Sequence, residues 1–382
     1  ELLNPKPAEV TLITRPRRFG KTLAMSMLEN FFDIKKNSRD LFAGLEISAS
    51  EELCSRWMNQ CPTVSLSFRQ VDGLDFSSAY DMLTMVISNL FNRHRYLLES
   101  QEISEFQKTA FVQIASQKAT AGEIKNSLIL LTDMMQTYYG KKVLLLVDEY
   151  DVPVAKANNN GYYEEMLDVM KGLMQALKDN RALGFAVVTG CMKIAKESIF
   201  TGTNNFVSDT IADSRLNEYF GFVQREVDQI LVDGEITDKR ELIKQWYDGY
   251  HFGDWDVYCP WDVMNYVLEL QHNPQAKPAG YWKNTSDNAI IRSFIDYAGG
   301  SITRKLEILM EGGYIIQQID KNLTYDYLHS SEDNLWSVLY LTGYLTQVRS
   351  ETLNRELPAG SAALQIPNAE IREIFETTVI RW

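Results

Sequence analysis

The chain has 382 residues, of which 45% are hydrophobic, and this length exceeds what one hydrophobic core usually serves, so we expect two domains. Its 38 Lys and Arg face 51 Asp and Glu, and the resulting net charge of −13 would repel a phosphate backbone. The composition is that of a globular protein, and the charge argues against direct nucleic-acid binding.

The four cysteines form no CxxC pair, and the four histidines show no metal-ligand spacing among themselves or with the cysteines. No apolar run approaches the ~20 residues that cross a bilayer, and the first residues lack the basic start and apolar stretch of a signal peptide. We therefore expect a reduced, cytoplasmic protein without structural zinc and without a membrane segment.

A predicted strand, loop and helix come first along the chain. The β-rich run Val10–Thr14 precedes the loop 15–22, Arg-Pro-Arg-Arg-Phe-Gly-Lys-Thr, and helical apolar spacing follows over 23–32. A loop that ends in Gly-Lys-Thr between a strand and a helix is typical of phosphate binding, because its N–H groups and the helix N-terminus point at the phosphates. The usual pattern has a glycine where this chain has Arg15, so the strict motif fails at its first position.

The loop also predicts the ligands of ATP and Mg²⁺. We expect Lys21 to reach the terminal phosphates, Thr22 to bind magnesium, and Gly20 to let the backbone approach the phosphates. Arg17 and Arg18 either add positive charge near the γ-phosphate or face a partner. The expected cofactor-binding residues are Arg17, Arg18, Phe19, Gly20, Lys21, Thr22 and Leu23.

Alternating strands and helices continue the first domain. Further strands are predicted at 63–68, 143–149 and 184–190, and helices at 77–98, 103–117, 123–138 and 162–179. The unbroken apolar run at 143–147 is typical of a strand that is buried on both faces of a parallel sheet. The alternation indicates an α/β fold with a parallel sheet flanked by helices, which we expect to span residues 1–222.

Two acids, Asp148 and Glu149, end the predicted strand at 143–149, and open α/β sheets bind ligands at that edge. We expect Asp148 to hold magnesium, directly or through water, and Glu149 to orient and deprotonate the attacking water. Thr189 either senses the γ-phosphate through a hydrogen bond or simply ends a buried strand, and Asp151 is a candidate helix cap or ion-pair partner. The nearest cations that could neutralise transition-state charge are Lys193, Lys196 and Arg215.

The pattern changes after residue 222. Short helices are predicted at 223–232, 238–247, 260–270, 288–297, 302–310 and 332–344, between turns that contain Gly or Pro. The aromatic stretches at 246–252 and 281–286 lie beside such turns, which favours core packing over base stacking, and His251 is interpreted as a packed histidine. We expect a mainly helical lid or winged-helix-like domain at 223–382.

These motifs together resemble the bacterial and archaeal AAA-ATPase-like family, whose phosphate loop Thr-Arg-Pro-Arg-Arg-Phe-Gly-Lys-Thr stands intact at 14–22. The resemblance continues through the motifs at 147–151, 189–190, 196–200, 204–205, 220–222, 247–250, 281–286 and 342–345. Because the family itself has arginine in place of the glycine, Arg15 looks like a family trait. The resemblance implies a P-loop NTPase core with a helical lid, similar to AAA and STAND-type ATPases, with the site residues Lys21, Thr22, Asp148 and Glu149.

Family members commonly continue into a C-terminal domain similar to PD-(D/E)XK nucleases, entered after a segment like 366–372. This chain ends at Trp382 and begins with residues that look like the inside of the family's opening helix, so we expect a piece of a longer protein without nuclease activity. The expected ligands are ATP and ADP. The expected partner is another protein or the nuclease-like domain.

Three functions are compatible with these motifs. The leading hypothesis is a Mg²⁺-dependent ATPase whose hydrolysis moves the helical domain and so regulates a C-terminal effector or partner. The alternative is a nucleotide switch that does not hydrolyse, and the Asp148–Glu149 pair argues against it because a pure binder needs no general base. A small-molecule or nucleoside kinase is less favoured, since the helical region has no obvious acceptor pocket.

Overall fold

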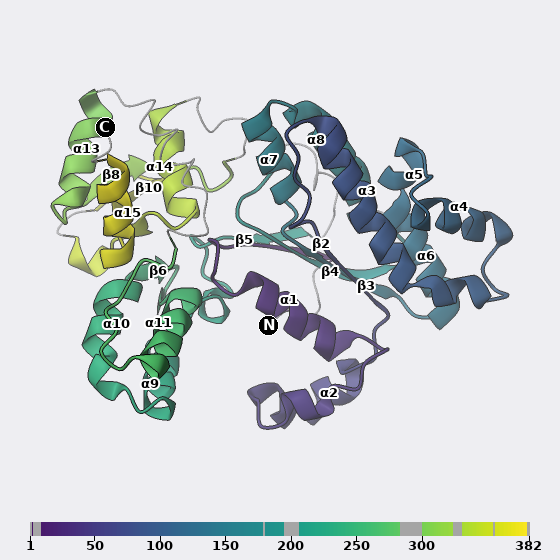
Figure 1. Ribbon diagram of the computed structural model, residues 1–382, viewed down its shortest axis with the longest axis horizontal. Coiled ribbons are helices and arrows are strands. Elements are labelled where there is room, and N and C mark those ends of the chain that lie inside the picture. Colours follow the sequence, from purple (N-terminus) through teal and green to yellow (C-terminus); the bar gives the residue numbers. More distant parts are fainter. Residues whose placement is uncertain are drawn as a thin grey trace. The chain divides into compact units, whose positions relative to one another are not determined.

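The structure is a computed structural model (Figure 1) that describes residues 2, 9–178, 180–194, 206–282, 300–323, 331–353 and 356–379. The chain forms two compact units: unit 1 comprises Glu1–Ile13 and Thr22–Ser208, and unit 2 comprises Thr14–Lys21 and Asp209–Trp382. The predicted phosphate loop therefore packs with the second half of the chain. These units are groups of residues that pack together and do not test the domain boundary predicted after residue 222, which stays a prediction.

A five-stranded sheet, in the order β2-β3-β4-β1-β5, forms the centre of the α/β region. Its strands are β1 Val10–Thr14, β2 Thr63–Ser67, β3 Val143–Asp148, β4 Leu183–Gly190 and β5 Phe206–Asp209. The β2–β3 and β3–β4 pairs are parallel. Since β1 lies between β4 and β5, the connections that leave β1 and β4 run in opposite directions, the arrangement that places ligands at the carboxyl ends of strands.

Helices flank this sheet, which confirms the predicted α/β fold. They are α1 Lys21–Phe32, α2 Glu51–Trp57, α3 Phe76–Arg93, α4 Glu105–Ala115, α5 Ala121–Lys125, α6 Ser127–Tyr139, α7 Val152–Asn160 and α8 Tyr163–Leu173. Short 3-10 turns are η1 Arg39–Phe42, η2 Glu46–Ala49, η3 Arg95–Glu99 and η4 Met174–Leu177.

Both faces of the sheet are covered, as the apolar run at 143–147 predicts. Leu145 and Val147 of β3 belong to a buried core that includes residues of α3, α6 and α8. On β4, the ring of Phe185 lies 5.5 Å from that of Phe32 in α1 and 5.9 Å from that of Trp57 in α2, measured between ring centroids. Figure 1 shows α1 and α2 on the side of the sheet opposite α3 and α8.

One predicted helix, at 123–138, is wrong as a single element, since the structure has α5 and α6 there. Thr120 caps α5 by accepting a hydrogen bond from the N–H of Glu123, and the Glu123 carboxylate accepts one from the N–H of Thr120. Asn126, with φ −94° and ψ 2°, lies outside both helices and ends α5. The apolar pattern missed α2 and α7, which are short.

Unit 2 has the helices predicted at 223–232, 238–247, 260–270, 302–310 and 332–344, with shifted ends. They are α9 Gln224–Asp233, α10 Arg240–Tyr247, α11 Pro260–His272, α13 Gly300–Met310 and α14 Glu332–Leu341, joined by η5 Asn217–Tyr219, η6 Thr237–Lys239 and η8 Ser350–Thr352. A further helix, α15 Ala369–Val379, is one that the pattern missed. The lid or winged-helix-like character of this region stays a prediction.

Two small sheets accompany these helices and were not predicted. The strands β6 Tyr250–Phe252 and β7 Trp255–Val257 form an antiparallel hairpin. The strands β8 Ile315–Gln318, β9 Thr346–Gln347 and β10 Ser361–Gln365 form a sheet in the order β8-β10-β9. The core-packing interpretation of the aromatic stretch is confirmed, because Tyr247, Tyr250 and Phe252 are at most 1% exposed.

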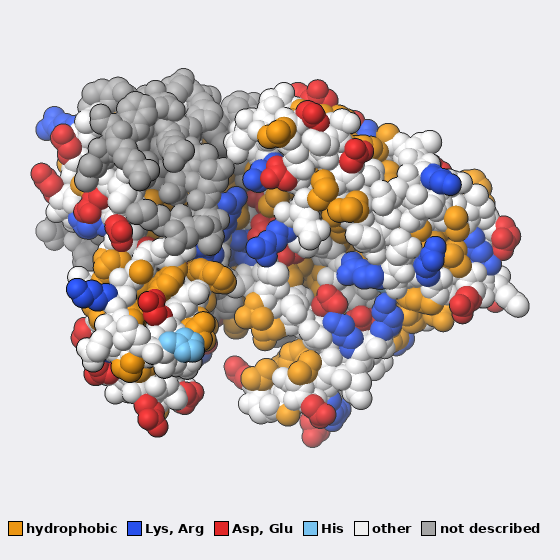
Figure 2. Space-filling model, viewed as in Figure 1, with side chains coloured by type: hydrophobic (Ala, Val, Ile, Leu, Met, Phe, Trp, Pro, Cys, Tyr) orange, Lys and Arg blue, Asp and Glu red, His pale blue; other side chains and the backbone are white. Residues whose placement is uncertain are grey.

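In the described part of the chain, no helix is both long enough and apolar enough to cross a membrane. Figure 2 shows Lys and Arg side chains interspersed with acidic and apolar ones over the visible face of unit 1. The predicted helix at 288–297, the candidate cation Lys196 and the motif residues at 196–200, 204–205 and 283–286 lie outside the described residues.

Candidate functional site

Two hydroxyl groups converge on the carboxylate of Asp148 in unit 1. Thr22 Oγ1 donates a hydrogen bond to Oδ2 at 2.8 Å, and Thr189 Oγ1 donates one to Oδ1 at 2.6 Å. Asp148 is the last residue of β3, Thr189 is next to last in β4, and Thr22 is the second residue of α1. The structure thus brings together three predicted site residues from three separate segments.

The oxygens of Thr22 and Asp148 fit a magnesium ion. Mg²⁺ takes oxygen ligands at about 2.0–2.1 Å in an octahedron, so two neighbouring ligands lie about 2.9 Å apart. Thr22 Oγ1 and Asp148 Oδ2 are 2.8 Å apart, which is close to that separation. Because Mg²⁺ usually keeps several waters and takes phosphate oxygens, one hydroxyl and one carboxylate are a sufficient protein contribution.

Glu149 directly follows Asp148 and has a left-handed backbone, with φ 54°. A residue other than glycine in this region is uncommon, and such strain clusters at functional sites. The Glu149 carbonyl accepts a hydrogen bond from the N–H of Val152 at 3.2 Å, which forms the turn into α7. The side chain is half-buried, at the carboxyl end of the central strand β3.

Asp151 connects the end of β3 to the segment that follows β4. Its Oδ2 accepts hydrogen bonds from the N–H groups of Cys191 at 2.9 Å and Met192 at 3.0 Å. The Tyr150 hydroxyl donates to the Met192 carbonyl at 3.0 Å and accepts from the N–H of Ile194 at 3.1 Å. Asp151 occupies the N-cap position of α7, but its side chain makes no capping bond, so the helix-cap interpretation of its side chain is wrong.

The predicted phosphate loop, in unit 2, contains two residues with a left-handed backbone, Arg18 (φ 73°) and Gly20 (φ 80°). A Cβ on Gly20 would have no atom within 4 Å, so the backbone conformation and not packing calls for glycine. Lys21 is 4% exposed, and its Nζ donates to the carbonyls of Arg15 at 3.1 Å and Pro16 at 3.0 Å. The ammonium group is therefore held against the backbone of its own loop.

Phe19 anchors the loop in an aromatic cluster of unit 2. The ring is fully buried, with centroids 4.9 Å from those of Tyr250 and Phe252 and 6.5 Å from that of Trp282. Gly343 lies beside this cluster, where an added Cβ would come within 2.9 Å of Pro16 and 3.0 Å of Trp282. Among the atoms of Phe19, only the backbone can contact a nucleotide.

The other predicted cofactor-binding residues fall into two groups. Arg17 and Leu23 are exposed, with Leu23 at 66%. Arg18 instead turns into unit 2, where its Nη1 donates to the Tyr281 carbonyl at 2.7 Å and its guanidinium lies 5.6 Å from the ring centroid of Trp261. These contacts hold the Arg18 side chain within its own chain, and the two roles that the sequence leaves open for it, at the γ-phosphate or toward a partner, stay predictions.

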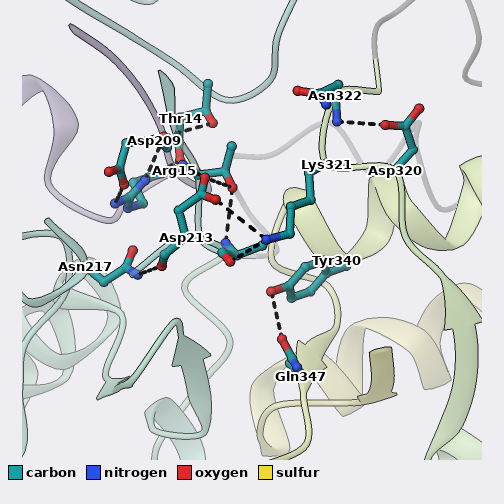
Figure 3. Close-up of polar contacts among 12 residues, drawn as sticks. Thr14, Arg15, Asp209, Asp213, Asn217, Asp320, Lys321, Asn322, Tyr340 and Gln347 are labelled. Atoms are coloured by element: carbon teal, nitrogen blue, oxygen red, sulfur yellow. Dashed lines mark hydrogen bonds and ion pairs between the residues drawn. The ribbon is translucent and has the colours of Figure 1, made fainter. Parts of the chain in front are cut away.

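Arg15, which replaces the first glycine of the motif, is fully buried in unit 2. Figure 3 shows its polar contacts. Its Nη2 lies 2.7 Å from Asp209 Oδ1 and donates to the Arg215 carbonyl at 3.1 Å. Its Nη1 donates to the carbonyls of Thr14 at 2.8 Å and Asp209 at 3.0 Å. The ring of Phe220 lies 5.2 Å from the guanidinium carbon. Burial lowers the pKa of Arg15 and raises that of Asp209, so desolvation opposes both charges and their mutual attraction offsets it.

The turn after Asp209 is itself fixed by polar contacts, as Figure 3 shows. Asp213 Oδ2 accepts from the N–H of Thr210 at 2.9 Å and from its hydroxyl at 2.8 Å. Lys321 donates to the carbonyl of Ala212 at 2.8 Å and lies 3.6 Å from Asp213. Arg15 therefore connects the start of the phosphate loop to the turn after Asp209, and its side chain is engaged there.

Of the three candidate cations, Lys193 is half-buried and Arg215 is exposed. Arg215 offers its carbonyl to Arg15, and its side chain forms no ion pair with the described residues. Sequence reasoning missed the roles of Arg15, Asp151 and Asp209. One sequence signal could have indicated the ion pair: Arg15 directly follows a strand of apolar and threonine residues, where burial is expected. A buried arginine requires an acid nearby.

Comparisons with known proteins show the family to which the chain belongs. Residues 2–200, which are half of the chain, match the model of the AAA-ATPase-like family, described as "Predicted AAA-ATPase". A protein from Azotobacter chroococcum mcd 1, named "Uncharacterized protein in vnfD 5'region", is 24% identical over 377 residues. That match covers 97% of this chain and 63% of the relative, so the chain spans less than two thirds of the relative's length. No solved structure matches. The chain belongs to the AAA-ATPase-like family of predicted AAA-ATPases.

Proposed function

We propose that this chain binds Mg-ATP and hydrolyses it, with the loop at 15–22 holding the phosphates and the two acids at the end of β3, Asp148 and Glu149, carrying the chemistry. The observation that supports this most strongly is the Asp148 carboxylate, which receives the hydroxyls of Thr22 and Thr189 on its two oxygens. Such an arrangement places one magnesium-binding hydroxyl and one carboxylate together at the end of a central strand. Family membership supports ATP binding independently of this geometry.

Each residue has a distinct part in the proposal. The N–H groups of the loop bind phosphate oxygens, and Lys21 moves from the carbonyls of Arg15 and Pro16 to the terminal phosphates. Thr22 and Asp148 hold Mg²⁺, which when bound neutralises charge on the β- and γ-phosphates.

The hydrolytic step needs one base. Glu149 takes a proton from water, the water oxygen bonds to the γ-phosphorus, and the bond from this phosphorus to the bridging oxygen breaks to give ADP and phosphate. Thr189 orients Asp148 through its 2.6 Å hydrogen bond. The left-handed backbone of Glu149 sets the direction in which its side chain leaves the main chain.

We propose further that hydrolysis moves the second region of the chain and so regulates an effector or partner. Support comes from the loop Thr14–Lys21, which packs as part of unit 2, so a change at the phosphates acts directly on this unit. More than a third of the relative's length lies outside the match, and a segment of this size is long enough to form an effector domain in that protein.

The test is phosphate release from Mg-ATP by the purified chain, with ATP affinity measured by calorimetry. Lys21→Ala is expected to lose binding, and Glu149→Gln is expected to keep binding and lose turnover by about 100-fold or more. Lys118→Ala and Glu165→Gln make the same chemical changes at exposed positions and serve as matched controls. Binding without turnover in the parent chain would replace the ATPase by a nucleotide switch, and absence of binding would overturn the proposal.

A further inference from the structure

Unit 2, which contains the phosphate loop, also contains two buried acids that have no part in the proposed hydrolysis. Asp262 is in the first turn of α11, and Glu370 is in the first turn of α15. Both residues are 0% exposed. The first turn of a helix favours negative charge, but an acid that is buried without partners is costly, so this pair requires a specific explanation.

The hydrogen bonds of the pair are incomplete unless one acid carries a proton. Glu370 Oε1 accepts a hydrogen bond from the N–H of Trp282 at 2.6 Å. Among the described residues, Glu370 Oε2 and both carboxyl oxygens of Asp262 have no hydrogen-bond partner of ordinary geometry. The weak thiol donor of Cys259 and the carboxyl group of Glu370 lie close enough to Asp262 to influence its pKa. Two carboxylates contain only acceptors, whereas one shared proton supplies the missing donor.

The electrostatics favour the singly protonated pair. Burial, followed by the charge of Asp262, raises the pKa of Glu370 to about 9, and burial also raises the pKa of Asp262. Arg18 is the cation that acts on both acids. The other titratable groups that interact with the pair are Cys259, Tyr247, Tyr250 and Tyr281, with Glu373 one turn further along α15 near Gly280.

One peptide group connects Arg18 of the phosphate loop to this pair, because the Tyr281 carbonyl accepts from Arg18 and the N–H of Trp282 donates to Glu370. Arg18 Nη2 is buried and makes no hydrogen bond to the described residues, while Nη1 donates to the Tyr281 carbonyl. The Arg18 carbonyl is 3.9 Å from the thiol sulfur of Cys259, three residues before Asp262. The backbone of Arg18 is left-handed, a conformation that a residue other than glycine keeps only where its surroundings hold it.

We propose that Asp262 and Glu370 are positioning residues for the phosphate loop: they share one proton, and the single remaining negative charge holds Arg18 and the loop backbone in the phosphate-binding conformation. The inference rests on the proposed function for its purpose, but the loop conformation can be measured without nucleotide. Loss of the shared proton to solvent leaves two facing carboxylates, and removal of both charges leaves Arg18 without a counter-charge.

Amide hydrogen exchange of the full chain at neutral pH, followed in peptides that cover 15–22, tests the positioning directly. Glu370→Gln keeps a donor to Asp262 and one negative charge, so the loop should exchange as in the parent chain. Asp262→Asn with Glu370→Gln keeps the shape but no charge, and the loop should exchange about tenfold faster. Arg18→Met should show the same acceleration alone and in combination. Glu376→Gln, on the exposed face of α15, is the matched control.

Calorimetry with ATP on the same variants reports the consequence for binding. The double variant should bind ATP about tenfold more weakly, and Glu370→Gln should bind as the parent does. Unchanged loop exchange in the double variant and in Arg18→Met overturns the positioning role, and so does an equal acceleration in Glu370→Gln. A parent chain that binds no ATP contradicts the proposed function alone, because the exchange measurement still decides the role of the pair.

Discussion

The hydroxyl of Thr189 donates a 2.6 Å hydrogen bond to Oδ1 of Asp148, across two neighbouring parallel strands. Thr22 occupies the other carboxylate oxygen at 2.8 Å. With both oxygens engaged, the Asp148 side chain has little freedom to rotate. The consequence is a carboxylate already oriented toward the first turn of α1, where the hydroxyl of Thr22 lies.

Replacing Thr189 by Val removes this hydrogen bond with almost no change in volume. Because such supporting hydrogen bonds orient a metal-binding carboxylate, we expect turnover to fall about 10- to 100-fold while ATP affinity changes little. The free energy of unfolding should fall by about 1 kcal/mol. Phosphate release, calorimetry and urea unfolding measure the three quantities.

A matched control exists at Thr132, which is also fully buried and donates to the Leu128 carbonyl at 2.9 Å within α6. Thr132→Val should lose at least as much stability, because Thr132 Oγ1 also accepts a hydrogen bond from Asn180 Nδ2 at 3.0 Å, and it should keep full turnover. If both variants lose turnover in proportion to stability, Thr189 only ends a buried strand, which is the alternative that the sequence leaves open.

Gly20→Ala tests the phosphate loop against a glycine of the same geometry. Gly20 has φ 80° and Gly161, after α7, has φ 83°, and a Cβ at either position meets no atom within 4 Å. Both substitutions should therefore cost about 1 kcal/mol of stability through backbone strain alone. Only Gly20→Ala should weaken ATP binding, by about tenfold or more, because its Cβ hinders the close approach of backbone to phosphate. Equal binding by the two variants would contradict the loop assignment.

The central sheet was predictable from the sequence because its signals are local. The six residues of β3 are all buried, and a continuous apolar run marks such a strand. The small strands β6 to β10 have two to five residues each, too few to show an alternation, and they form through pairing between distant segments. The break at Asn126 between α5 and α6 was also not predictable, since the capping box of Thr120 and Glu123 marks the start of α5 but not its end.

The candidate site was predictable where a motif fixes the chemistry and unpredictable where tertiary contacts do. Gly-Lys-Thr and the two acids at the end of β3 indicate Thr22 and Asp148, which the structure joins by a hydrogen bond. The partner of Arg15 is 194 positions away, so no local pattern shows the pairing with Asp209. The contacts of Arg18 with Tyr281 and Trp261 were unpredictable for the same reason, since these residues lie far away in the sequence.

His94 gives the chain an acid-sensitive element in unit 1. The residue is 3% exposed, and burial, with Lys35 and Arg93 nearby, lowers its pKa to about 3. The unfolded chain binds a proton at this histidine near pH 6.5 while the folded chain does not, so the stability that is present above pH 6.5 is lost as pH falls toward 3. We expect His94→Asn to reduce this loss, by on the order of 2 kcal/mol between pH 6.5 and 4.5.

Urea unfolding at a series of pH values measures that dependence. The comparison is between slopes of unfolding free energy against pH, since His94→Asn also changes the hydrogen bond to Tyr96 and lowers stability at every pH. His272→Asn, at an exposed position near the end of α11, should leave the slope as it is in the parent chain. An unchanged slope in His94→Asn would show that other groups account for the acid sensitivity.

The ion pair of Arg15 and Asp209 allows the most direct test of why the motif has arginine at its first position. Either single change, Arg15→Met or Asp209→Asn, leaves a buried group without its partner and should cost about 3–5 kcal/mol of unfolding free energy. Lys108→Met, at the half-exposed pair with Glu105, should change stability by less than about 1 kcal/mol. Arg15→Met combined with Asp209→Leu removes both charges, and it should recover most of the stability lost in the single variants.

ATP affinity of the double variant then distinguishes a structural role of Arg15 from a direct contact with phosphate. If Arg15 only stabilises the loop through its ion pair, the double variant binds ATP nearly as well as the parent chain. If Arg15 contacts phosphate directly, binding stays weak despite the recovered stability.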